Sequence, residues 1–251
     1  DPTTNRPYVA YQNYRDFLSA AVRAFDGQTW KHIAEGLWSS EQVNSINIDF
    51  DSLGTINLLY IEQNFNQNLT LSFFNGVTIE KRYLDFFTSP YIPILQIASD
   101  GNPLIAYRDG SFFNETSVLK FDKQLEIWGH VGNPGFSTIN ADRMSFAIDS
   151  NDTPHVLCYE NNVGFKILKL NNTWEELSTD GLVIRSIYIP HMAFNSQNEL
   201  HIVYTDSKND YKLTVKKYNG FAWENVGNTI FSQKRAGLNG RQFTLYKFRS
   251  M

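Results

Sequence analysis

One short phrase recurs five times along this chain of 251 residues, and the recurrence limits the possible folds more than any other feature. The five copies are RPYVAYQN at 6–13, TINLLYIE at 55–62, NPLIAYRDG at 102–110, TPHVLCYE at 153–160 and ELHIVYTD at 199–206. Their anchor residues are Tyr11, Tyr60, Tyr107, Cys158 and Tyr204, which are spaced by 49, 47, 51 and 46 positions. A period near 50 residues is typical of solenoids, propellers and other repeat arrays.

Each repeat reads as four short strands. The first is an apolar stretch, and a tight turn such as DSLGT or DSNDTP leads from it into the recurring phrase. A third strand follows, and a turn such as FDGQTW or YNGFAW then leads into a fourth strand that carries a tryptophan in most copies. Aromatic residues make up 15% of the chain, which favours strands, and no useful helical periodicity is present. Four antiparallel strands per repeat predict an all-β fold made of β-propeller blades.

The ends of the chain suggest how the blades close into a ring. The first repeat lacks its first strand, and the tail at 241–248 (RQFTLYKF) is an apolar strand with no successor. We therefore predict a single domain over 1–251, a five-bladed propeller in which the C-terminal strand completes the first blade and removes an open sheet edge. The alternative is a piece of a larger propeller that is cut inside a blade.

The repeat pattern resembles propeller repeats of bacterial surface and secreted proteins, which group with sialidase-like and lectin-type propellers. RPYVAYQN, NPLIAYRDG and KLTVKKYNGFAW carry this resemblance most clearly. The turns FDGQTW and YNGFAW also resemble the Asp-box of sialidases, S-x-D-x-G-x-T-W, although they lack its serine and are one residue shorter. The resemblance covers almost the whole chain. It implies the fold and a secreted or cell-surface location, and it implies no particular activity.

Antiparallel strand order predicts two unlike faces. The short turns lie on one face, and the other face holds longer loops at 34–45, 82–92, 130–143, 177–190 and 226–240. Function usually lies on such loops. A polar residue follows each anchor by two positions on the long-loop face: Asn13, Glu62, Asp109, Glu160 and Asp206. Either these side chains cap the loops that they begin, or they form a polar ring that holds a cation or sugar hydroxyls.

Nine residues are predicted to bind the ligand because they break the repeat or lie on the long-loop face. These are Trp38, Phe87, Tyr91, Asp109, Phe136, Asp142, Arg143, Tyr188 and Phe231. Exposed aromatic rings stack on sugars, and the planar guanidinium of arginine binds carboxylates and phosphates. The alternative roles are packing over the blades and at the strand entries, and surface salt bridges.

Composition and motifs exclude several other classes of function. A net charge of −4 gives no basic surplus for nucleic acid, and no apolar run approaches the roughly 18 residues that span a membrane. CxxC, HExxH and paired-histidine spacings are absent, and the single cysteine, Cys158, lies in a buried strand pattern. We therefore predict no metal, no cofactor and no catalytic residue, and the oligomeric state stays open.

The sequence favours a non-catalytic recognition module that binds a glycan or a protein partner on the long-loop face. Similar blades without a distinct catalytic set indicate binding more than catalysis. The first alternative is a glycoside hydrolase of five-bladed or sialidase-like type, with Asp49, Glu62, Asp109 and Asp142 as the available axial carboxylates. The second alternative is an architectural domain of a larger surface protein or toxin.

Overall fold

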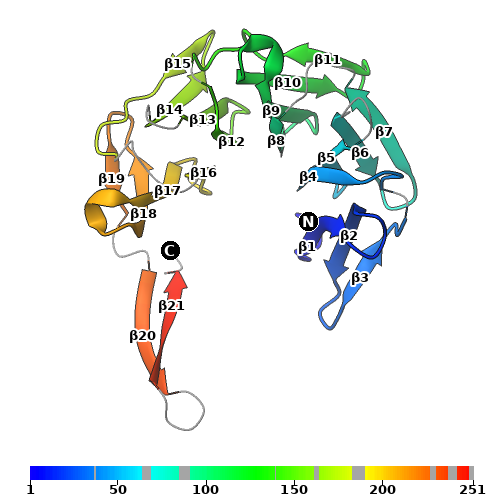
Figure 1. Cartoon of the computed structure of the whole chain (residues 1–251), viewed down its shortest axis with the longest axis horizontal. Helices are drawn as coiled ribbons and strands as arrows, with labels where there is room; N and C mark the ends of the chain where they lie inside the picture. The colour runs from blue at the N-terminus through cyan, green and yellow to red at the C-terminus, as the bar shows by residue number, and fades with distance from the viewer. Residues whose placement is uncertain are drawn as a thin grey trace.

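The computed structural model of the chain is all-β, as predicted. It describes residues 1–36, 38–63, 69–84, 91–138, 140–160, 164–182, 190–226, 230–236 and 242–248, without the side chains of Tyr91, Glu160 and the last two ranges. Six antiparallel sheets follow one another along the chain: one of three strands, four of four strands and, at the C-terminal end, one of two strands. The first five lie around an open arc, with the first strand of each four-stranded sheet on the inside (Figure 1). These first five sheets are the five repeats of the sequence.

The first sheet has three strands and the next four have four each. The first sheet contains β1 (Tyr8–Asn13), β2 (Ser19–Phe25) and β3 (Trp30–Ile33). The second contains β4 (Val43–Phe50), β5 (Ile56–Glu62), β6 (Leu69–Phe74) and β7 (Ile79–Leu84). The third contains β8 (Tyr91–Ile97), β9 (Pro103–Asp109), β10 (Glu115–Asp122) and β11 (Ile127–His130). The fourth contains β12 (Arg143–Ile148), β13 (Pro154–Glu160), β14 (Gly164–Leu170) and β15 (Trp174–Glu176). The fifth contains β16 (His191–Phe194), β17 (Leu200–Asp206), β18 (Lys212–Tyr218) and β19 (Trp223–Asn225).

The hydrophobic core is divided into four layers, and each layer lies between two consecutive sheets. Successive side chains of the strands that carry the anchors contribute to two different layers, because successive side chains of a strand point to opposite faces of the sheet. In β5, for example, Leu58 and Tyr60 pack toward the first sheet, whereas Leu59 and Ile61 pack toward the third. This arrangement explains the repeated phrase: both faces of its strand must be apolar.

The structure corrects the predicted closure of the ring. The C-terminal strand β21 (Gln242–Phe248) pairs antiparallel with β20 (Ile230–Ala236) instead of completing the first sheet. The sequence analysis had assigned 226–240 to a loop and so missed β20. Pairing with a neighbour in sequence closes a far shorter loop than pairing with β1, and its entropic cost is correspondingly smaller. Among the described residues, β1 pairs only with β2.

The β20–β21 hairpin repeats the geometry of the first two strands of the complete sheets. Five residues separate those strands each time, at 51–55, 98–102, 149–153, 195–199 and 237–241. The residues that flank each connection are also paired in register, as Phe50 with Ile56 and Ala236 with Gln242 show. The two C-terminal strands therefore match the first two strands of a complete sheet in spacing and register.

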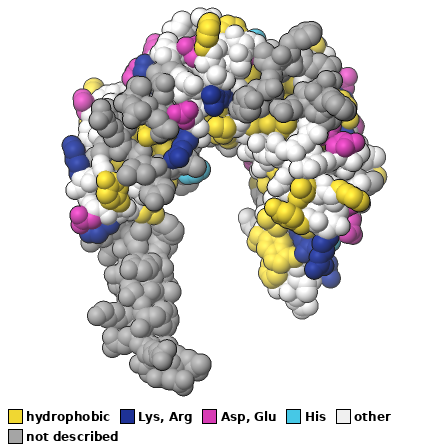
Figure 2. Space-filling view, viewed as in Figure 1, with side chains coloured by type: hydrophobic (Ala, Val, Ile, Leu, Met, Phe, Trp, Pro, Cys, Tyr) yellow, Lys and Arg dark blue, Asp and Glu magenta, His cyan; other side chains and the backbone are white. Residues whose placement is uncertain are grey.

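One face of the first sheet is exposed, whereas the equivalent face of each of the next four sheets packs against the sheet before it. Val9 is 40% exposed, whereas its equivalent in the second sheet, Leu58, is fully buried against the first. In the space-filling view, this end of the arc shows hydrophobic side chains beside Lys and Arg (Figure 2).

Candidate functional site

The long-loop face carries one loop that recurs in three sheets. In the first, third and fifth sheets, five residues connect the strand that carries the anchor to the strand that follows it. These loops are 14–18 between β1 and β2, 110–114 between β9 and β10, and 207–211 between β17 and β18. In the third and fifth sheets the loop begins with a short 3₁₀ helix, η1 (Gly110–Phe112) or η2 (Ser207–Asn209). Each loop follows the polar residue that recurs two positions after the anchor.

The polar residue before each of these loops caps it. Asn13 Oδ1 accepts a hydrogen bond from the Arg15 backbone N–H at 3.2 Å. Asp109 and Asp206 accept the corresponding bonds, at 3.0 and 2.8 Å. Of the two interpretations of the recurring polar residue, the structural one is therefore confirmed for these three positions.

The end of each loop has a strained backbone. Two consecutive residues adopt the left-handed conformation with positive φ: Phe17 and Leu18, Phe113 and Asn114, and Asp210 and Tyr211. This conformation costs a non-glycine residue about 1 kcal/mol, and aromatic residues are poorly suited to it. Such strain persists only where the surroundings fix the backbone, and it is frequent at functional sites.

These strained positions hold exposed aromatic rings. Phe17 is 91% exposed, Phe113 is 88% exposed and Tyr211 is 53% exposed. We call these three side chains the loop-tip aromatics. None of the three is among the predicted ligand-binding residues, which lie mainly in the longer connections between sheets. The shared loop length after a capping Asn or Asp is the sequence signal that identifies them.

Asp109 is a structural residue. Its side chain is almost fully buried, and its second oxygen accepts hydrogen bonds from Tyr107 Oη at 2.9 Å and Ser117 Oγ at 2.7 Å. All of these bonds lie within the third sheet and its loop. The prediction that Asp109 binds a ligand finds no free oxygen to support it.

Of two predicted aromatic ligand-binding residues, Trp38 lies inside the protein, which corrects its prediction, and Phe136 is half-buried against a neighbouring ring. Trp38 is fully buried, donates from Nε1 to the carbonyl of Ile33 at 2.8 Å and packs edge-on against Phe74. Phe136 stacks on Trp174 of the fourth sheet, with ring centroids 3.7 Å apart. A long loop can fold back over the core, so membership of such a loop does not establish that a ring is exposed.

The remaining predicted residues are only partly placed. Asp142 and Arg143 are adjacent and half-buried at the start of β12, and the Arg143 guanidinium lies 6.0 Å from the centre of the Tyr159 ring. Tyr91 begins β8 and Phe231 lies in β20, but their side chains lie outside the description. Phe87 and Tyr188 fall outside the described residues altogether.

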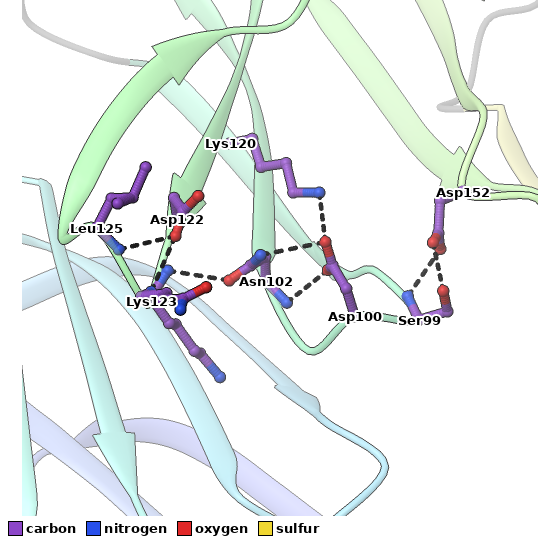
Figure 3. Close-up of polar contacts among 9 residues, drawn as sticks. Ser99, Asp100, Asn102, Lys120, Asp122, Lys123, Leu125 and Asp152 are labelled. Atoms are coloured by element: carbon purple, nitrogen blue, oxygen red, sulfur yellow. Dashed lines mark hydrogen bonds and ion pairs between the residues drawn. The ribbon is translucent and has the colours of Figure 1, made fainter.

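The short-turn face is a network of turn-capping side chains. In four turns that precede the last strand of a sheet, including the two that resemble an Asp-box, the first Asp or Asn accepts backbone hydrogen bonds from the residues two and three positions later. These residues are Asp26, Asn75, Asp122 and Asn219. Figure 3 shows the third sheet, where Asp100 also accepts a bond from Lys120 at 2.6 Å. The Asp-box likeness is thus explained by turn geometry.

Side chains of this face also join neighbouring sheets. Asp152 has positive φ at the fourth position of its turn and accepts hydrogen bonds from the backbone N–H and hydroxyl of Ser99 in the third sheet (Figure 3). Asn198, at the equivalent position of the fifth sheet, accepts from the Ser150 N–H at 2.7 Å. The polar groups of this face are therefore used to hold the sheets together.

Metal and thiol chemistry find no support in the described part of the chain. No group of three or more His, Cys, Asp or Glu side chains there is arranged to hold a metal ion. Cys158 is fully buried, as predicted, and burial raises the pKa of its thiol to about 12. No helix among the described residues is both long and apolar enough to cross a membrane.

Comparisons with known proteins identify the fold. No protein-family model matches the chain, and no curated protein matches it in sequence. Among solved structures it is similar to the Hadza microbial sialidase Hz136 (TM-score 0.56, 14% identity), covering 84% of this chain and 52% of that one. It is also similar to AofleA from Arthrobotrys oligospora (TM-score 0.60, 10% identity), covering 95% of this chain and 70% of that one. A third similar structure is a polysaccharide lyase, PL25 ulvan lyase (TM-score 0.55, 10% identity), with 82% of this chain and 60% of the lyase covered. The chain spans about half the length of the sialidase. At these identities the likeness shows a propeller-type fold and no more.

Proposed function

We propose that this chain is a non-catalytic recognition module, a single domain over residues 1–251 that binds a glycan on its long-loop face. The observation that carries the proposal is the recurrence of an exposed aromatic ring on a strained loop in the first, third and fifth sheets. A glycan ligand would place the protein at the cell surface or outside the cell.

Exposure and strain together support a binding role. A large aromatic side chain left in water forgoes the free energy of burial, which is worth about 1.5–3 kcal/mol. The left-handed backbone adds a further cost. Because the same combination occurs in the first, third and fifth sheets, it is a repeated feature of the face and not a local accident. Flat rings held on a rigid scaffold can stack on the apolar faces of sugar rings.

The solved structures that resemble this fold add support of a different kind. One is a sialidase and another a polysaccharide lyase, and a lyase structure bound to a -[GlcA(1-4)Rha3S]- saccharide also resembles the chain with a TM-score of 0.56. Proteins with this architecture therefore include several that act on carbohydrates. This agrees with a glycan ligand but does not identify one.

Two of the carboxylates available to a hydrolase already have structural roles. Asp109 is held by three hydrogen bonds within its own sheet. Asp49 accepts from its neighbour Phe50 and from the Ile97 N–H of the adjacent inner strand, at 2.8 and 3.0 Å. An acid and base pair needs carboxylates that are free to exchange protons with the substrate. These contacts favour recognition over hydrolysis.

A glycan array, followed by titration of the best neutral ligand, tests the proposal. We expect Phe17→Ala, Phe113→Ala and Tyr211→Ala each to weaken binding severalfold, and the triple variant to abolish it. Phe221→Ala is the matched control, because Phe221 is 84% exposed but lies on the short-turn face. An equal loss in the control, or no binding of any sugar at millimolar concentration, contradicts the glycan proposal; the latter result favours a protein ligand.

A further inference from the structure

A groove of about 590 Å³ lies on the uncovered face of the first sheet, beside one of the recurring loops. Its lining includes three aromatic rings, from Tyr11, Tyr14 and Trp30, and two guanidinium groups, from Arg15 and Arg23. None of the described residues that line it is Asp or Glu. A groove that combines aromatic surface with two cations and no acid is complementary to an anionic ligand.

Arg23 is held in place by an imidazole and an aromatic ring. Its Nε and Nη2 donate to Nε2 of His32, at 3.1 and 2.6 Å, and its guanidinium lies 5.7 Å from the centre of the Tyr11 ring. Both contacts fix the side chain without neutralising its charge. The guanidinium is thus already oriented before a ligand arrives, which lowers the entropic cost of binding.

The groove keeps its positive charge. In the described part of the chain, no ion pair joins Arg15 or Arg23 to a carboxylate. Glu35 is close by, but it lies 3.7 Å from His32 Nε2 and approaches the imidazole. Arg15 is exposed on loop 14–18, where the Asn13 cap fixes its backbone.

The residue at the Arg23 position varies among the sheets. Arg23 pairs with Val9 across β1 and β2, and the equivalent residues of the next four sheets are Ser72, Leu119, Leu168 and Lys216. The first three are buried, whereas Lys216 is half-buried and donates to the carbonyl of Gly181. Arg23 differs from all four because its guanidinium lines an open groove beside a second arginine, Arg15.

We propose that the first-sheet groove binds an anionic group, carboxylate or sulfate, of an acidic polysaccharide. This rests on the proposed function and specifies one subsite of it. Arg15 and Arg23 bind the anionic group, and Tyr14 and Trp30, which are 84% and 44% exposed, contact the sugar rings. The third- and fifth-sheet loops lack this pair of arginines, so they bind neutral parts of a glycan.

Calorimetric titration with matched probes tests the subsite. Oligogalacturonate is compared with its methyl ester, and dextran sulfate with dextran, so that the two arms separate a carboxylate from a sulfate. We expect the charged member of at least one pair to bind at least tenfold more tightly than its neutral partner, with an affinity that falls as salt rises. Equal binding of the charged and neutral members in both pairs would overturn the inference.

Variants locate the effect. Arg23→Leu introduces the residue that the third and fourth sheets carry, so it preserves the fold, and we expect it and Arg15→Gln each to lose tenfold or more. Arg23→Lys retains the charge without the planar fork and should fall between. Lys31→Gln is the control, because Lys31 lies on the same sheet outside the groove and pairs with Asp26. If Lys31→Gln weakens binding as much as Arg23→Leu, the attraction is non-specific and the subsite is wrong.

Two further outcomes separate this inference from its rivals. If the loop-tip aromatics bind neutral glycans while no charged probe binds, the subsite fails and the proposed function stands. If no glycan binds at all, both fail. Binding to vesicles that contain phosphatidylserine, without binding to either acidic saccharide, also overturns the inference, because the anionic partner is then a lipid surface.

Discussion

The two faces of the sheets differ in how they use their polar and aromatic residues. On the short-turn face, Asp and Asn side chains cap turns and join neighbouring sheets, as Asp152 joins the third and fourth. On the long-loop face, capping residues hold loops whose last positions are strained and carry exposed rings, as at Phe113. The same strands support both faces. The short-turn face therefore stabilises the fold, whereas the long-loop face carries strained loops and exposed rings that lower the stability of the fold.

Trp38 gives the largest expected effect, because it lies in a connection of the long-loop face but belongs to the core. Trp38→Ala should lower the free energy of unfolding by about 3–5 kcal/mol, since it leaves a cavity between the first and second sheets. Chemical denaturation measures the change, and Phe221→Ala should differ from the wild type by less than about 0.5 kcal/mol. A stable Trp38→Ala variant with weakened glycan binding would restore Trp38 to the ligand site.

Asp51 tests the short-turn face. Its buried carboxylate accepts hydrogen bonds from the Leu53 and Thr55 N–H groups, at 3.1 and 2.9 Å, and lies 3.3 Å from Lys123 of the third sheet. Asp51→Ala should cost about 2 kcal/mol of stability, because these are bonds to a charged acceptor. Asp51→Asn keeps an acceptor for the turn and should cost less, which denaturation of both variants can check. Equal losses would assign the effect to the Lys123 ion pair instead of the turn.

Phe113 tests the long-loop face in the opposite direction. Phe113→Asn should raise the free energy of unfolding by about 0.5–1 kcal/mol, because asparagine tolerates the left-handed backbone and the exposed ring contributes little burial. The same variant should bind glycan less well. Phe221→Asn is the control, since Phe221 is similarly exposed without a positive φ. A loss of stability in Phe113→Asn would show that the ring stabilises its loop.

The smallest expected effect is a difference in pH dependence between a half-buried aspartate, Asp49, and an exposed one, Asp26. Burial raises the pKa of Asp49, so the folded state holds this proton more tightly and the contribution of Asp49 to stability falls as pH rises above about 4. Backbone hydrogen bonds from Thr29 and Gln28 lower the pKa of exposed Asp26, so its contribution is present above that pH and is lost as pH falls. Urea unfolding between about pH 3 and 6 measures how the free energy of unfolding changes with pH. Asp49→Asn should remove a decrease of this free energy with rising pH, and Asp26→Asn should remove an increase. Slopes of the same sign would contradict the burial of Asp49.

The sequence predicted the repeat and the strand order within each four-stranded sheet, because these depend on local patterns, but it missed the separate sheet that β20 and β21 form. A period near 50 residues, an apolar phrase of fixed length and Asn or Asp in each turn are visible without any tertiary contact. The capping role of Asn13, Asp109 and Asp206 was also available, since a capping residue bonds to its own loop. The loop-tip aromatics were available in principle, through the shared loop length.

The errors came from features that depend on distant parts of the chain. Whether the ring of Trp38 faces solvent or the second sheet depends on how residues 34–42 fold back, and no local pattern in the sequence records this. The partner of β21 depends on which free strand edge is nearer.

The amino-acid sequence by itself determined an all-β chain of repeated four-stranded units with two unlike faces, because hydrogen bonding and side-chain alternation within a strand are local. Only the tertiary structure decided which rings stay in water, which strand pairs with the tail, and that Arg23 faces an open groove. Those outcomes depend on packing between sheets, where the free energy of burial is shared by residues far apart in the sequence.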